Sequence, residues 1–413
     1  MCDQQNETQL TAFMTDHNLE LPFWEGFIAT KLDRRCGAVW IDLRRCPSAA
    51  MVCSGCGHHC YRVHEAGIRI IRELPMFGEP VWLRVPLRRL RCSQCGTRTE
   101  RVSWLDRYAR VTRSLADFVS TWCEKLPVAH VCKLAGLHWE TVRTIERTRL
   151  EPRLAGLAEP QPTRLVMDEF ALFKGHRYAT AVLDADTRRV LWVGEGRSRE
   201  AIRPFFEWLG VERCAKIEAV AMDMNTAFDL EVRQHCQNAR VVYDLFHVIA
   251  KYGREVIDRV RVDEANRLRD NRPQRKIVKR ARWLLLRNPE NVPPDQQTTL
   301  DELLAANQAL MTVYVMKASL KELWQHNNAK AWLAAWRNWL AMARDSGIDA
   351  LRKFAAKLKP YWRGIVARLR WPMHTGQLEG INNRIKVMKR MAYGYRDSAF
   401  FFMKIKAAFP GNP

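Results

Sequence analysis

Three acidic residues occupy positions that are unusual for ordinary solvent-exposed acids. Glu379 is the single acid among the 39 residues from Arg352 to Arg390, which carry eleven Lys and Arg. Asp168 and Asp223 each end an apolar, strand-like run far upstream. Clustered acids cannot all stay ionised unless cations screen them, and hard cations such as Mg²⁺ or Mn²⁺ prefer carboxylate oxygens. The pattern therefore predicts a divalent-metal site that acts on a polyanion.

The elements after Thr163 predict how two of these acids meet. Strands are expected at 165–172, 176–183, 189–194, 217–222 and 240–243, with a helix from the Ser198 cap to about Leu209. In a sheet of order 3-2-1-4-5, the first and fourth strands are parallel neighbours. Carboxylates near the C-terminal ends of these two strands, Asp168 and Asp223, then meet at one edge of the sheet.

Glu379 would complete this group from a helix expected over 376–392 and packed across the same edge. Asp184 and Asp186 follow an antiparallel strand, so they are expected at the opposite edge, where they serve a turn. Glu169 is adjacent to Asp168 and would face the other side of the strand.

Two CxxC pairs predict a zinc site. Cys53 and Cys56 form the first pair, Cys92 and Cys95 the second, and a glycine follows each. Zn²⁺ favours four tetrahedral thiolates or imidazoles, and four thiolates leave no open position, so the zinc would be structural. A β-hairpin through residues 68–71 and 81–84 would close the long gap between the pairs. Alternative ligands follow the first pair closely: His58, His59 and Cys60.

The segment from 115 to 149 has the spacing of a helix-turn-helix. Helices are expected at 115–124 and 128–135, followed by a short turn with Gly136 and a recognition helix from Trp139. Its candidate contacts with DNA phosphates and base edges are Thr141, Arg143, Thr144, Arg147 and Arg149. A helical connector with solvated charges is the alternative interpretation.

The charge balance favours a nucleic-acid partner. Lys and Arg exceed Asp and Glu by 22, and the sequence pI is about 9.8. No apolar run approaches the roughly 20 residues of a spanning helix, so a membrane partner is not expected. The N-terminus lacks a secretion signal and the cysteines are too dilute for a disulfide scaffold, which favours a cytoplasmic protein. A basic helical run adds expected phosphate contacts at Arg275, Lys276, Lys279 and Arg280.

Several motifs together resemble one family. They are the paired CxxC sequences and the segments 167–178 (MDEFALFKGHRY), 221–225 (AMDMN), 243–247 (YDLFH) and 377–386 (QLEGINNRIK). The chain resembles bacterial insertion-sequence transposases of the DDE class, ISL3 family. The resemblance implies that Asp168, Asp223 and Glu379 form a metal-binding triad. It also implies an auxiliary D-x-x-H signature at Asp244 and His247, where His247 serves either a structural hydrogen bond or proton transfer.

The expected fold class is multidomain α+β. It combines a small zinc-ribbon-like β domain, a helix-turn-helix and a ribonuclease H-like α/β catalytic domain with a large helical insertion. The expected boundaries are 1–108 for the zinc-binding domain, 109–151 for the helix-turn-helix, 152–162 for a linker, 163–247 for the first part of the catalytic domain, 248–371 for the basic insertion, and 372–413 for the C-terminal helix and tail.

The resemblance implies a DNA transposase that binds the terminal inverted repeats of an insertion sequence. Two-metal-ion phosphoryl transfer would then cleave and join strands, with Asp168 bridging both ions and Asp223 and Glu379 each holding one. The expected partners are double-stranded DNA, as element ends and target, and further copies of the chain in a homodimer or higher oligomer. The protein is expected in the bacterial cytoplasm, associated with the nucleoid. The alternatives are a structure-selective nuclease or resolvase, and a non-catalytic DNA-binding regulator.

Overall fold

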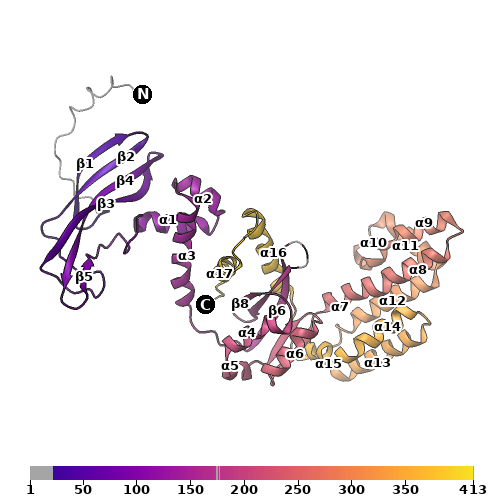
Figure 1. Ribbon diagram of the computed structural model, residues 1–413. Helices are drawn as coiled ribbons and strands as arrows, with labels where there is room; N and C mark the ends of the chain where they lie inside the picture. Colours follow the sequence, from indigo (N-terminus) through magenta and orange to yellow (C-terminus); the bar gives the residue numbers. More distant parts are fainter. Residues whose placement is uncertain (1–21, 174, 176, 413) are drawn as a thin grey trace. The chain divides into compact units, whose positions relative to one another are not determined.

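The computed structural model describes residues 22–173, 175 and 177–412 (Figure 1). The chain forms two compact units. One holds the residues up to Gly156 together with Met388–Arg396, and the other holds Leu157–Val387 and the residues from Asp397 onward. Within the described residues, no helix combines the length and apolar character that crossing a bilayer requires.

A five-stranded sheet begins the first unit. Its strands are β1 (Phe27–Arg35), β2 (Ala38–Arg45), β3 (Val63–Met76), β4 (Glu79–Cys92) and β5 (Gly96–Thr99). They lie in the order β1-β2-β4-β3, and β5 pairs with β4. The predicted hairpin is present: β3 and β4 are antiparallel, with Ile71 opposite Leu83. Phe77 and Gly78, both with positive φ, form the tight turn between them.

Three helices follow in the same unit: α1 (Arg113–Cys123), α2 (Val128–Ala135) and α3 (Trp139–Ala155). The Thr112 hydroxyl caps α1 by accepting a hydrogen bond from the Leu115 N–H. Gly136 ends α2 in the left-handed conformation, as the predicted turn requires. The prediction was wrong at the end of α3, because the helix continues to Ala155 with Pro152 inside it. The linker expected over 152–162 therefore begins within a helix.

Two buried charged residues on β3 join this sheet to the helices. Arg72 donates to the carbonyls of Val81, at 3.0 Å, and of Ala135 at the end of α2, at 3.4 Å. Glu73 accepts from the Thr112 hydroxyl at 2.7 Å and from the Trp24 indole at 3.0 Å. These hydrogen bonds tie the sheet to the cap of α1 and to the end of α2.

The second unit is built on a mixed sheet. Its strands are β6 (Arg164–Phe173), β7 (Arg177–Asp184), β8 (Val190–Glu195), β9 (Ala219–Met222) and β10 (Arg240–Tyr243). The order is β10-β9-β6-β7-β8, which confirms the predicted 3-2-1-4-5 arrangement. Strands β6, β9 and β10 are parallel, and β7 is antiparallel to β6.

Helices cover both faces of this sheet. Leu165, Met167 and Met222 face one side and share a core with α4 (Arg199–Leu209) and α6 (Thr226–His235), near the short α5 (Val211–Ala215). Ser198 caps α4, as predicted. The other face receives α16 (Gly376–Met391) and α17 (Ser398–Ala408). The sequence did not predict α17, which packs against β8.

The basic insertion is helical throughout, as expected. It comprises α7 (Leu245–Tyr252), which continues through one π-helical turn into α8 (Asp258–Arg267), then α9 (Arg272–Arg280), α10 (Arg282–Leu286), α11 (Pro294–Ala306), α12 (Gln308–Glu322), α13 (Ala329–Asp345), α14 (Asp349–Leu358) and α15 (Trp362–Val366).

A stacked row of three tryptophans, Trp332, Trp336 and Trp339, lies in the core of the insertion, which confirms the expected packing role. The insertion returns to the sheet where α15 meets β10. There Gly364 is required, because a Cβ would lie 2.3 Å from the Tyr243 ring.

Candidate functional site

The parallel strands set three aspartates at one level. Val166 on β6 pairs with Ala221 on β9, so the same register two residues further sets Asp168 beside Asp223. Met222 pairs with Tyr243 on β10, which sets Asp223 beside Asp244. Successive residues of a strand alternate between the two faces of the sheet. All three aspartates therefore belong to the face opposite the core that contains Met167 and Met222. The predicted meeting of Asp168 and Asp223 is therefore present, and Asp244 joins them.

Asp168 is the most enclosed carboxylate of the triad. Its Oδ1 accepts from the Glu169 N–H at 2.8 Å, and its Oδ2 accepts from the Asn382 amide Nδ2 at 2.8 Å. Burial raises the pKa of Asp168 to about 6, and the nearby Glu169 and Asp223 charges act in the same direction. Each oxygen accepts one hydrogen bond and a carboxylate has about four lone-pair sites, so the group retains capacity for a cation.

Asp223 is more open to solvent and is held from two sides. Its Oδ1 accepts from the Met224 N–H at 2.6 Å. Its Oδ2 lies 3.4 Å from Nδ1 of His247, which projects from α7. His247, the histidine of the predicted D-x-x-H signature, therefore lies beside Asp223.

Asp244 is buried and fixes the start of α16. Its Oδ2 accepts from the Thr375 N–H at 2.6 Å and from the Thr375 hydroxyl at 2.7 Å, while its Oδ1 caps α7 by accepting from the Phe246 N–H. Burial alone would raise the pKa of Asp244, but these hydrogen bonds hold it below the ordinary value. Asp244 therefore acts on the site indirectly, through the helix that carries Glu379.

Glu379 lies between two anchors on α16. Thr375 precedes it by four residues and Asn382 follows it by three, so all three lie along one side of the helix. Thr375 is tied to Asp244, and Asn382 to Asp168. The Glu379 N–H donates to the Thr375 carbonyl at 3.0 Å, which continues the helix from its anchored first turn.

Asn382 is a site residue that the sequence analysis missed. Its side chain is 5% exposed, and its Oδ1 is buried with no hydrogen-bond partner in the described part of the chain. The sequence signal was available but weak: Asn382 follows Glu379 at helical spacing, so the two residues share a helix side. Its contact with Asp168 spans 214 positions.

The three carboxylates are not packed into one compact group. Within the described residues, only four cysteines form a set of three or more potential ligands whose atoms all lie within 4.8 Å of one another. Glu379 is exposed, and carboxylates without a screening cation repel one another. The donor set of Asp168, Asp223 and Glu379 consists of oxygens alone, which suits Mg²⁺ or Mn²⁺ rather than zinc.

The neighbouring acids lie where the sheet geometry predicted. Asp184 pairs with Leu165 near the start of β6, three residues before Asp168, and accepts from the Thr187 hydroxyl at 2.8 Å within a turn. Asp186 pairs with Arg164 in the same turn. Glu169 contacts Arg197 at 3.2 Å.

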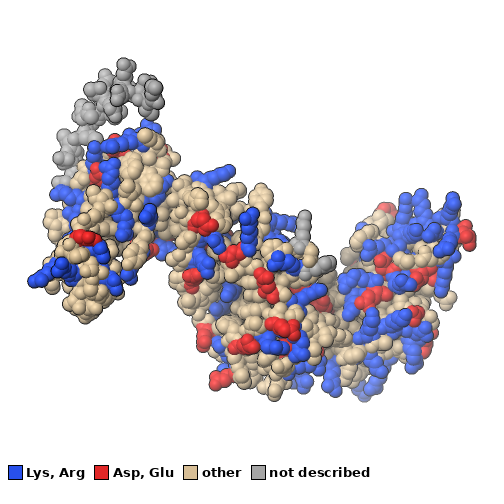
Figure 2. All heavy atoms as spheres, viewed as in Figure 1, with Lys and Arg blue, Asp and Glu red and all other residues tan. Residues whose placement is uncertain are grey.

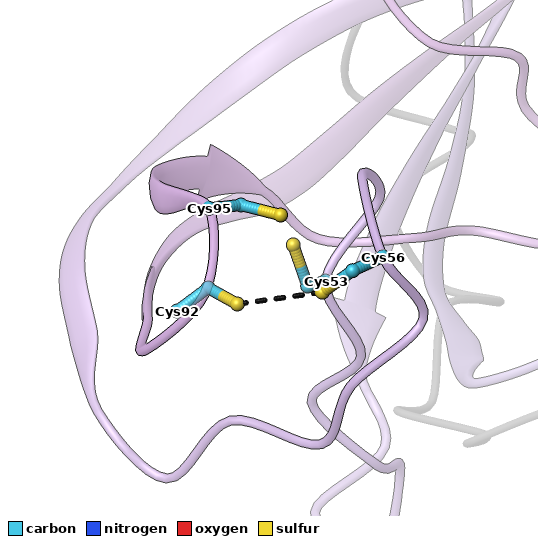
Figure 3. A group of neighbouring side chains, drawn as sticks. All are labelled: Cys53, Cys56, Cys92 and Cys95. Atoms are coloured by element: carbon cyan, nitrogen blue, oxygen red, sulfur yellow. Dashed lines mark hydrogen bonds between the residues drawn. The ribbon is translucent and has the colours of Figure 1, made fainter.

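The four predicted zinc ligands converge in the first unit. The sulfurs of Cys53, Cys56, Cys92 and Cys95 point toward one another (Figure 3), and those of Cys56 and Cys92 are 3.5 Å apart. The alternative ligands His58, His59 and Cys60 are not part of this group. Backbone N–H groups of Cys95 and Gln94 lower the pKa of Cys92 to about 6, which favours the thiolate that Zn²⁺ binds. The geometry fits one tetrahedral Zn²⁺.

The predicted DNA contacts of α3 differ in how available they are. Thr144 and Arg147 are exposed, and Thr141 and Arg143 are partly exposed. Arg147 pairs with Glu151, and Arg143 lies 3.5 Å from Glu140. Arg149 is engaged within the fold, because its guanidinium lies 2.9 Å from Asp117 on α1 and 3.4 Å from Asp106. It therefore also helps to hold α3 against α1.

The first unit thus carries a four-cysteine group and a helix-turn-helix, and the second carries acids along one edge of a mixed sheet. Three family models match in succession: "zinc-finger of transposase IS204/IS1001/IS1096/IS1165" over residues 49–95, "Helix-turn-helix domain of transposase family ISL3" over 100–149, and "Transposase" over 165–405. The chain belongs to the ISL3 family of insertion-sequence transposases, as the motifs had indicated.

Two curated relatives agree with this family. The transposase for insertion sequence element IS1001 of Bordetella parapertussis is 53% identical over 366 residues, which cover 88% of this chain and 89% of the relative. The transposase for insertion sequence element IS1557 of Mycobacterium tuberculosis is 27% identical over 369 residues, covering 83% and 82%.

The cysteine group generates the first prediction. Purified protein should contain about one zinc per chain, because four converging thiolates complete a tetrahedral site. A Cys92→Ser/Cys95→Ser variant should lose that zinc and unfold the first unit at lower temperature. Cys36→Ser, at an exposed cysteine outside the group, should keep the metal. Elemental analysis decides the matter, and equal zinc in all three proteins would contradict the assignment.

The raised pKa of Asp168 generates a prediction about stability. Without added divalent cations, Asp168→Asn should melt at a higher temperature than the natural chain at about pH 7.5. The gain should shrink as the pH falls from about 6 toward 4, because the natural carboxyl then becomes protonated in the folded chain. Calorimetry across this pH range measures the difference in melting temperature. Asp186→Asn, at an exposed position, is the control and should show no such gain. Parallel melting curves for Asp168→Asn and the natural chain at every pH would contradict it.

Proposed function

We propose that this transposase binds the terminal inverted repeats of its insertion sequence and catalyses metal-dependent DNA strand cleavage and strand transfer. One observation carries the proposal. Asp168 and Asp223 lie just past the end of the parallel ladder between β6 and β9, and the helix of Glu379 is tied there through Asp168 and Asp244. A regulator that used the first unit alone would leave this arrangement without a role.

Asp168, Asp223 and Glu379 would hold Mg²⁺ or Mn²⁺. Divalent cations bound there supply an activated oxygen nucleophile and stabilise the leaving oxygen of the phosphodiester. Asp168 is enclosed and would hold a cation in a fixed position on the sheet. The exposed Glu379 side chain could adjust its position as a DNA strand enters. Asn382 and Asp244 are positioning residues, and His247 restrains Asp223.

The first unit would recognise the element ends. Arg72 and Glu73 tie its sheet to the end of α2 and to the cap of α1, and α3 packs against both of these helices. The double-stranded element ends and the target DNA are the partners. An insertion sequence has two ends and each chain has one candidate site, so acting on both ends calls for a homodimer or higher oligomer. We place this activity in the bacterial cytoplasm, on nucleoid DNA.

Replacing a triad carboxylate tests the proposal. Asp168→Ala, Asp223→Ala and Glu379→Ala should each lower cleavage of end-containing DNA by about 100-fold or more, because each removes a cation ligand. End binding, measured by gel shift without Mg²⁺, should persist or strengthen through lost repulsion of phosphates.

Three acids beside the triad supply the controls. Glu169→Ala, Asp184→Ala and Asp186→Ala should retain at least partial cleavage, since their side chains serve a strand face or a turn. An active Glu379→Ala variant would refute the proposed site. So would an Asp186→Ala variant as inactive as Asp168→Ala.

Adjacent asparagines test the positioning role of Asn382. Asn382→Ala should weaken both cleavage and Mn²⁺ affinity by about 10- to 100-fold, because residues that orient a ligand matter nearly as much as the ligand. Asn383→Ala, at an exposed position one residue further, should change neither. Calorimetric titration with Mn²⁺ measures affinity apart from activity. Loss of cleavage with unchanged Mn²⁺ binding would contradict the positioning role.

A further inference from the structure

A stripe of cations on α9 ends in an exposed indole. Arg272, Lys276, Lys279 and Trp283 follow one another at i, i+4, i+7 and i+11, which is the spacing of one helix side. At Ala281, the single residue between α9 and α10, the N–H donates to the Ile277 carbonyl at 3.1 Å and the carbonyl accepts from the Leu285 N–H at 3.0 Å, so the hydrogen bonding of a helix continues through it. The stripe therefore runs on from the cations to Trp283.

The cations of this stripe are uncompensated. In the part of the chain that the structure describes, no carboxylate lies within salt-bridge distance of Arg272, Lys276 or Lys279. Nearby arginines do find acids: Arg261 and Arg282 both contact Asp258. Figure 2 shows Lys and Arg gathered over this part of the insertion. A helix side that keeps its charges unpaired while its neighbours pair is suited to phosphates.

Trp283 differs from the other tryptophans of the insertion. Its side chain is 67% exposed, whereas Trp332, Trp336 and Trp339 are each at most 4% exposed. The Arg282 guanidinium lies 5.4 Å from the ring centroid, so it covers at most one face of the indole. An exposed indole costs solvation free energy that a core tryptophan does not, so a ligand that covers this ring would stabilise it.

We propose that this stripe binds DNA whose bases are unpaired, with Trp283 stacking on one base while Arg272, Lys276 and Lys279 contact the phosphates on either side. In a duplex the bases are stacked inside, where an indole on a phosphate-binding helix cannot reach a base face. Cations in line with an aromatic platform are the combination that grips single strands. Strand cleavage and joining create unpaired nucleotides, so the inference rests on the proposed function.

The test measures binding alone and does not need cleavage. Full-length Asp168→Ala protein, with and without Trp283→Ala, is titrated into fluorescein-labelled oligothymidine and into a random duplex of the same length, without added Mg²⁺. Trp283→Ala should weaken oligothymidine binding by roughly tenfold, the loss of one stacked base, and duplex binding by less than about twofold. Trp283→Phe, which keeps an aromatic face, should restore most of the single-strand affinity.

Two further variants separate stacking from charge. Lys279→Ala should weaken both DNA forms and lower the salt dependence by about one phosphate contact. Trp208→Ala, at another exposed tryptophan in the same unit, should change neither. Equal weakening of single strand and duplex by Trp283→Ala, or none, would overturn the inference. Failure of end cleavage in the natural chain would instead count against the proposed function, since these titrations proceed without it.

Discussion

The mutual repulsion of acids at one sheet edge is the constraint on which the second unit depends. The register of β6, β9 and β10 sets three aspartates level with one another. Each accepts hydrogen bonds: Asp168 from the Asn382 amide, Asp223 from the Met224 N–H, and Asp244 from a hydroxyl and N–H groups. Most of these donors are neutral, so they orient the carboxylates without cancelling the charge that a cation requires.

The aspartates differ in how many hydrogen bonds they accept, and this difference separates their roles. Asp244 accepts three hydrogen bonds, which hold its pKa low and make it a fixed structural anion. Asp168 accepts two, and burial outweighs them, so its pKa is raised to about 6. Holding Asp168 ionised at neutral pH thus costs stability, which a bound cation would return. Asp168 is thus an enclosed carboxylate with few hydrogen-bond donors, whereas Asp244, two strands away across β9, is held by three.

Local patterns predicted the sheet and the zinc ligands well, because those features depend on residues close in sequence. Alternating apolar runs gave the five strands, and the CxxC spacing gave Cys53, Cys56, Cys92 and Cys95. The contacts that organise the site could not be predicted this way. Thr375 meets Asp244 across 131 positions, and Asn382 meets Asp168 across 214. Such pairs depend on how α16 docks, and no periodicity encodes that.

The sequence also could not show which arginines of α3 remain exposed and which form ion pairs within the fold. Arg149 and Arg147 are two positions apart on α3, yet Arg149 bridges Asp117 and Asp106 while Arg147 remains exposed. Their sequence surroundings are alike. The difference comes from α1, whose Asp117 lies against one side of α3 only. Pro152 gave a wrong boundary. In the sequence it indicated a linker, but α3 continues past it to Ala155.

The Asp244–Thr375 contact also explains how a large insertion can interrupt a catalytic domain. Asp244 is the residue immediately before α7, where the insertion begins, and Thr375 is the residue immediately before α16, where the sheet domain resumes. Two hydrogen bonds to one buried carboxylate therefore join the two ends of the insertion. Beside them, Gly364 allows α15 to approach the Tyr243 ring. The base of the insertion is thus closed beside the sheet edge, and the same closure fixes the first turn of the helix that carries Glu379.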